Sequence, residues 1–194
     1  MEADWSVEIG GDAAVIETGW PGWIDIAQDR KRIALLDEVL NFPALGQAME
    51  NILSAKSRFL PTKCDFWRSD EPVDPYEFDA QPGTHHTSAN CSLDLLPQPV
   101  TRWSNLLAAE SWARAAVAAF QSIRCPGARV EIVLRQAFEQ QQSGIGIALY
   151  ASACGPTTAQ AAEALIPALH HAVAVVCTAD PDAEDTAETS GGLQ

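Results

Sequence analysis

Residues 130–149 read VEIVLRQAFEQQQSGIGIAL, and this stretch decides which fold we expect. Apolar side chains recur at every second position on either side of a polar segment, at Val130, Ile132, Leu134, Ile145, Ile147 and Leu149. A period of two is the spacing of a strand that buries one face. Residues 140–144 carry the polar residues and the glycine of a turn. The stretch therefore predicts a β-hairpin with one apolar face.

Helical patterns lie on both sides of this hairpin. Before it, apolar residues recur at helical spacing over 103–120, and the pattern stops at the Pro-Gly pair of 126–127. After it, Thr157 and Gln160 have the spacing of a capping box, which satisfies free backbone groups at the start of a helix. We therefore expect a helix on each side of the hairpin.

The first half of the chain predicts the same kinds of element from weaker patterns. Residues 5–9 and 13–18 alternate around a Gly-Gly-Asp segment, whose residues suit a tight turn, so we expect an N-terminal hairpin. Further along the chain, helical spacing and then strand alternation appear at residues 30–41, 43–53, 63–67 and 89–95.

Short strands that alternate with single helices predict an α+β fold. We expect an antiparallel sheet of about six strands, made of hairpin-helix units, with the helices packed mainly on one face. Residues 1–178 would form a single domain, since 194 residues suit one hydrophobic core. Residues 179–194 are acidic and contain no large apolar group before Leu193, so we expect a disordered tail.

The composition is acidic, with 26 aspartates and glutamates against 12 lysines and arginines and a net charge of −14. Such a charge repels phosphates and anionic lipid heads, so we expect neither nucleic acid nor a membrane as a partner. The longest apolar run, residues 172–176, is too short to cross a bilayer. Five scattered cysteines without a CxxC pair, and the lack of a signal-peptide pattern, favour free thiols and a cytoplasmic location.

The central acidic loop, residues 69–86, and the strand before it carry side chains of the types that bind metals. The candidate ligands are Asp65, Asp70, His85 and His86. Adjacent histidines in an extended segment point to opposite sides, however, and their spacing to the next cysteine matches no zinc template. The alternative is a solvated loop between paired strands, and we expect no cofactor.

Cys154 is the candidate catalytic residue, because it lies between a predicted strand and the predicted helix start at Thr157. The dipole and the free N–H groups of a helix N-terminus favour a thiolate. The sequence places no base beside this thiol, and the alternative is a buried cysteine that only fills space.

Three tryptophans in or near predicted turns are candidate ligand-binding residues: Trp20, Trp23 and Trp67. An exposed aromatic cluster can bind a ligand or a protein partner. Burial in or near the core is the alternative for each of them.

No Walker A, Rossmann, G-x-S-x-G or H-E-x-x-H pattern occurs in the sequence. The leading hypothesis is a non-enzymatic binding or assembly module of the cytoplasm. The strand around Ile147 carries small or apolar residues on its other side too, at Ala148 and Tyr150, so a second copy would cover that face in a homodimer. The alternative hypothesis is an enzyme or a metal-binding protein with its site in the central segment, residues 64–91.

Overall fold

Six strands form one mixed sheet in the computed structural model, which describes residues 1–20, 23–54, 57–81 and 86–179. The strand order is β1-β5-β6-β4-β3, and β2 also pairs with β5. β1 and β2 run parallel to β5, and the other pairs are antiparallel. The predicted α+β class is confirmed, whereas the prediction of a purely antiparallel sheet is wrong. The strands are β1 (Glu2–Glu8), β2 (Ile16–Glu17), β3 (Phe59–Ser69), β4 (Thr87–Pro97), β5 (Ala128–Glu139) and β6 (Gln142–Gly155).

The hairpin predicted from residues 130–149 is present, and its second strand lies at the centre of the sheet. β5 pairs with β6 along its whole length, up to Glu139 opposite Gln142. Only two residues form the turn, and the first of them, Gln140, has a positive φ of 56°. β6 therefore begins at Gln142, inside the 140–144 segment that the sequence predicts as the turn.

The predicted N-terminal hairpin does not form. The chain turns at Gly10 but then resumes its original direction beside the same strand. Glu8 pairs with Arg135 and Ile16 pairs with Ala137, so the whole β1–β2 connection passes a single residue of β5. A turn signal is local, whereas the partner of a strand depends on burial across the whole sheet. The prediction of a turn at these residues is therefore confirmed, and the prediction that the two strands pair with each other is wrong.

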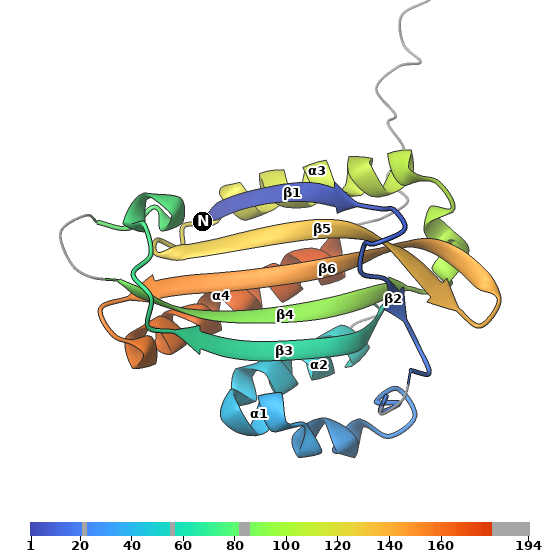
Figure 1. Ribbon diagram of the computed structural model, residues 1–194, viewed down its shortest axis with the longest axis horizontal. Helices are drawn as coiled ribbons and strands as arrows, with labels where there is room; N and C mark the ends of the chain where they lie inside the picture. The colour runs from blue at the N-terminus through green and yellow to red at the C-terminus, as the bar shows by residue number, and fades with distance from the viewer. Residues whose placement is uncertain (21–22, 55–56, 82–85, 180–194) are drawn as a thin grey trace, which may run out of the picture.

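The long helices lie on one face of the sheet, behind it in Figure 1. They are α2 (Pro43–Ser54), α3 (Leu106–Gln121) and α4 (Thr158–Thr178). The Thr157 hydroxyl accepts a hydrogen bond from the N–H of Gln160, 3.2 Å away, which confirms the predicted helix start. The acidic segment 180–194 of the predicted tail lies outside the described residues.

The helix predicted over residues 30–41 is divided into two short elements, η1 (Arg30–Leu35) and α1 (Asp37–Asn41). Leu36 between them is extended, with φ −72° and ψ 132°. The break lets the chain wrap around the edge of the sheet beside β3, where Figure 1 shows both elements. The other short helical elements are η2 (Pro75–Phe78) and η3 (Val100–Trp103).

α4 is the one described helix that is long and apolar enough to cross a membrane, with a mean hydropathy of 1.4 over its most apolar 18 residues. Half of that window is buried inside the fold. Its buried side includes Leu165, Leu169 and Val173, which belong to the core beneath the sheet. The core helix of a soluble protein passes the same test of length and composition, so the test is weak evidence for a membrane.

Two cores of unequal size lie on opposite faces of the sheet. The larger one lies between the sheet and the helices and includes the rings of Phe59, Trp103 and Trp112, whose centroids are 5.3 to 5.7 Å apart. The smaller one lies against the other face and fixes β2 there. Its buried members are Ile16, Leu96, Val100 and Ala137.

Gly144 offers a direct test of how closely η3 approaches β6. A Cβ added at this position would overlap the carbonyl oxygen of Val100 and lie 3.2 Å from that of Trp103, and both are backbone atoms that cannot swing away. We expect Gly144→Ala to lower the free energy of unfolding by more than about 2 kcal/mol. Chemical denaturation measures the change.

Gly11→Ala is the matched control, because nothing lies within 4 Å of the added methyl and the backbone there has no positive φ. We expect this variant to stay within about 0.5 kcal/mol of the parent protein. Equal stability of the two variants would contradict the close approach of η3 to β6.

Candidate functional site

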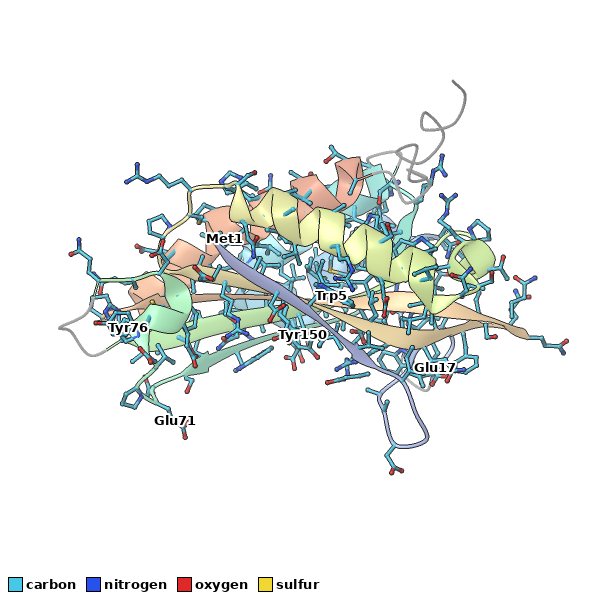
Figure 2. All side chains as sticks on the ribbon, turned by 90° about the horizontal axis from the view of Figure 1, so that it is seen from above. Met1, Trp5, Glu17, Glu71, Tyr76 and Tyr150 are labelled. Carbon is cyan, nitrogen blue, oxygen red and sulfur yellow. The ribbon has the colours of Figure 1, made fainter. Side chains whose placement is uncertain are left out.

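The sheet face away from the helices is polar. The β1–β2 connection also projects on this side, as does the segment around Glu71 (Figure 2). Charged and hydrogen-bonding side chains occupy many of the outward positions of β3, β4, β6 and β5. By strand register these residues are Lys63, Asp65, Trp67, Ser88, Asn90, Ser92, Asp94, Arg129, Glu131, Arg135, Tyr150 and Ser152.

A pocket of about 240 Å³, which we call the polar pocket, lies on this face at the end where β2 is attached. Strands β3, β4 and β5 contribute to it, and the segment from the β1–β2 connection to Trp20 forms the rest of its wall. Its polar and aromatic lining residues are Glu17, Trp20, Thr62, Lys63, Asp94 and Arg135.

Three charged side chains of the polar pocket come from three different strands. Lys63 and Asp94 are direct partners in the antiparallel β3–β4 pair. Arg135 lies on β5, and β6 runs between it and Asp94. The β6 residues opposite them are Gly146 and Ala148, which have little or no side chain. The space between the charged groups is therefore not filled by the strand that separates them.

Arg135 is held in place by its neighbours on the sheet. Its Nε and Nη2 donate to Oε2 of Glu8 at 3.0 and 2.7 Å, and only 12% of its side chain is exposed. Its Cζ lies 5.8 Å from the centre of the Tyr150 ring. Burial acts to lower the pKa of Arg135, but hydrogen bonds to Glu8 and Tyr150 outweigh this effect and raise the pKa. The guanidinium is thus a fixed charge that Glu8 already balances.

Asp94 is partly buried, and in the described chain its carboxylate accepts no hydrogen bond. The Thr62 hydroxyl donates to the main-chain carbonyl of Asp94 instead, at 3.3 Å. Burial raises the pKa of the Asp94 carboxyl above its ordinary value, and the charges of Arg135 and Lys63 oppose the shift without cancelling it. The ionised carboxylate is therefore stabilised by nearby charge but by no hydrogen bond from the described chain, and a donor entering the pocket would supply one.

A second and mostly apolar cavity of about 100 Å³, the apolar pocket, adjoins the first. The two share Trp20, Thr62 and Lys63. The pairing of β3 with β4 is irregular between Pro61 and Lys63, where the two pockets meet. The apolar pocket is lined mainly by Ile24, Ile26, Leu36, Met49, Pro61 and Cys64.

The candidate metal ligands are spread along the sheet. Asp65 accepts a hydrogen bond from the neighbouring N–H of Phe66, and Asp70 is exposed just beyond β3. His86 is buried, with its Nε2 3.2 Å from the carbonyl oxygen of Gln81. The register of β3 and β4 places His86 about six residues, or roughly 20 Å, from Asp65.

No three His, Cys, Asp or Glu side chains within residues 1–20, 23–54, 57–81 and 86–179 are grouped as metal ligands. His85 lies outside the described residues. The central loop is also attached to the sheet, since Phe78 is buried and its carbonyl accepts a hydrogen bond from the N–H of Gly127 at 2.8 Å. The described part of this loop is thus packed rather than wholly solvated.

The candidate catalytic residue Cys154 is buried at the end of β6, three positions before the cap of α4. Burial raises its pKa, and a hydrogen bond from its own backbone opposes the shift. Burial thus acts against the thiolate that the helix N-terminus was expected to favour. Catalysis by Cys154 stays a prediction.

Of the three candidate tryptophans, Trp20 lines both pockets and is 38% exposed. Trp67 is 41% exposed on β3, four residues from Lys63, and lines neither described pocket. Trp23 is partly buried, and neither described pocket includes it. The structure therefore places one of the three at the candidate site.

The charged residues of the polar pocket were absent from the sequence-based candidates. Asp94 interrupts a strand of apolar residues, and Arg135 follows three apolar residues. Their positions were thus weak indications of a functional role. Alternation placed them on outward faces but did not show which residues they meet. Lys63 becomes the neighbour of Asp94 only through the register of β3 against β4.

Comparison with protein-family models, with curated proteins and with solved structures finds no match to this chain. The function must therefore be argued from the chemistry of the site itself.

The partly buried thiol of Cys64 on β3 and the buried thiol of Cys91 on β4 should resist alkylation in the folded protein. Burial raises the pKa of Cys64 and of Cys91 to about 12. At pH 8 we expect both to react with iodoacetamide at least about a hundredfold more slowly than a free cysteine, because the thiolate is the nucleophile. Mass spectrometry of peptides after timed labelling measures the rates, with the denatured protein as control. Rapid native labelling of Cys91 would contradict this account.

Replacing Asp94 with asparagine should stabilise the protein at neutral pH. Burial raises the folded-state pKa of Asp94. The contribution of this carboxyl to the free energy of unfolding is therefore complete below its unfolded-state pKa of about 3.9, and it is lost as the pH rises through the folded-state pKa. Asparagine stays neutral, so the melting temperature of Asp94→Asn relative to the parent should increase from acid to neutral pH. Thermal melts across pH measure this difference, and a difference that falls with pH would oppose the assignment.

Proposed function

We propose that this protein is a non-enzymatic binding module, and that its ligand is a small polar organic molecule held in the polar pocket. The observation that carries the proposal is the partly buried carboxylate of Asp94, which accepts no hydrogen bond in the described chain. Burial of a carboxylate whose charge the neighbouring cations only partly compensate lowers the stability of the folded state, and groups of this kind are a recurrent feature of functional sites.

Charges of both signs at fixed places support the proposal. Arg135 is rigidly held by Glu8, and Lys63 stands directly across from Asp94. Trp20 supplies an aromatic wall, and Thr62 carries a hydroxyl group. A few converging polar groups beside an aromatic surface are the usual composition of a small-molecule site.

The chemistry of the lining favours binding over catalysis. The polar pocket is lined by no histidine, cysteine or serine of the described chain, so a Ser–His or Cys–His pair is not available there among these residues. The raised pKa of Asp94 favours one other candidate function, acid–base catalysis on a bound substrate. An enzyme or metal-binding protein with its site at residues 64–91 has weaker support, since the described residues of that segment form no ligand cluster.

The cytoplasmic homodimer expected from the sequence stays a prediction. The sheet face that would form its interface carries charges of both signs, including Arg129 and Glu131 on β5. A second copy on this face would have to pair those charges across the interface, because burying them unpaired is costly.

The proposal predicts saturable changes in the backbone NMR signals of Thr62, Lys63 and Arg135 when a suitable small molecule is added. Suitable probes are n-butylamine, butanoate, 4-aminobutanoate and butan-1-ol, each titrated to millimolar concentration. At least one should bind, and the signal of Trp67, outside the described pockets, should stay in place. If no probe produces saturable shifts, the proposal is wrong.

Asp94→Asn then tests the position of the ligand. Removing this charge should change the affinity of a charged probe by roughly tenfold, downward for an amine and upward for a carboxylate. Asp65→Asn is the matched control, because Asp65 is exposed on the same sheet face but does not line the pocket. We expect this variant to stay within about twofold of the parent. Equal effects of the two substitutions would place the ligand elsewhere.

A further inference from the structure

The two pockets adjoin at the edge of the sheet. They share Trp20, Thr62 and Lys63 and meet at the irregular part of β3, so a path from one to the other would run past these residues. The chain between β2 and α1 follows the same route, from the polar face of the sheet around the β3 edge (Figure 1). A ligand longer than the polar pocket would pass Thr62 and enter the apolar pocket.

The apolar pocket suits a short hydrocarbon chain. Its wall is built from aliphatic side chains such as Ile24 and Leu36 and from the ring of Pro61. Its volume of about 100 Å³ corresponds to about three water molecules in the liquid. Water gains few hydrogen bonds against such a wall, so apolar groups enter at a gain of about 0.8 kcal/mol per methylene.

The charges around the path favour a cation. Glu17 and Asp94 line the polar pocket, and Glu38 lines the apolar one. Lys63, which lines both pockets, and Arg135 oppose them, and the charge of Arg135 is balanced by two hydrogen bonds to Glu8. The chain as a whole has a net charge of −14, which attracts cations over long range.

We propose that the ligand is an amphipathic amine, with its ammonium group at Asp94 and its hydrocarbon part in the apolar pocket. This inference rests on the binding function proposed above. Trp20 borders both pockets and suits both halves of such a ligand, because a tryptophan face attracts an ammonium group and packs against hydrocarbon.

A carboxylate ligand is the rival that Lys63 and Arg135 would select. Arg135 already donates two hydrogen bonds to Glu8, so it has less to offer an incoming anion. An anion would also approach the carboxylate of Asp94, which lies directly across the strand pair from Lys63. Lys63 is exposed, and its flexible side chain can turn into solvent when a cation enters.

Two homologous series separate these ligands: the n-alkylamines from propyl to hexyl, and the n-alkanoates of the same lengths. Calorimetric titration of the full chain measures each affinity. We expect amine affinity to rise roughly fourfold per methylene until the apolar pocket is filled. Alkanoates of equal length should bind about tenfold more weakly or worse.

Two substitutions then locate the two ends of the ligand. Asp94→Asn should weaken every amine by a similar factor and leave the gain per methylene unchanged. Leu36→Ala should reduce the gain per methylene, because Leu36 is part of the apolar wall. Leu40→Ala is its control, since Leu40 is 66% exposed on the neighbouring helix and lines neither described pocket. Thermal melts of each variant establish that it is folded.

Each outcome decides between the two proposals. Amines that bind with the expected length dependence, lost in Leu36→Ala, support the amphipathic ligand. Alkanoates that bind more tightly than amines overturn it and leave the binding function standing. Propylamine that binds as tightly as hexylamine removes the role of the apolar pocket. Absence of binding by both series and by the polar probes above overturns both proposals.

Discussion

The arrangement of this protein depends on β6, a central strand whose two faces differ in side-chain size over residues 144–149. Towards the helices it presents Ile147 and Leu149, which are fully or almost fully buried. Towards the other side it presents Gly144, Gly146 and Ala148, which leave the backbone nearly bare. The large side chains build the main core, and the small ones let other segments approach the opposite face.

Those approaches create the candidate site. The Val100 carbonyl lies against Gly144, and the Ile16 side chain lies against Gly146, so η3 and β2 can pack where larger residues would exclude them. The small core around Ile16 holds β2 in place, and the segment after β2 forms a wall of the polar pocket. A packing constraint on a central strand thus determines where a binding site is possible.

The electrostatics of the pocket follow from its partial burial. Removing Asp94 from water disfavours its charged form, and the nearby cations only partly compensate. Arg135 shows the opposite balance, because hydrogen bonds to Glu8 and Tyr150 outweigh the cost of its burial. The site therefore combines one satisfied charge with one unsatisfied charge, and this asymmetry selects the ligand that we propose.

Local patterns were enough to find most elements. The alternation over residues 130–149 identified the central hairpin, and the Thr157 capping signal located the start of α4. The same reasoning failed for the N-terminal segment, where the residues at Gly10 form a turn that does not make a hairpin. It also missed the polar pocket, because Lys63, Asp94 and Arg135 come from separate strands whose register no local pattern shows.

The sequence by itself determined which side chains of each strand face together, because the period of two is a property of the extended backbone. It also determined the helix boundaries marked by caps, since those depend on a few neighbouring residues. Only the tertiary structure decided that β1 runs parallel to β5 and that Lys63 meets Asp94. Strand order and register depend on how much apolar surface the whole sheet buries. That burial is determined only when segments distant in the sequence pack together.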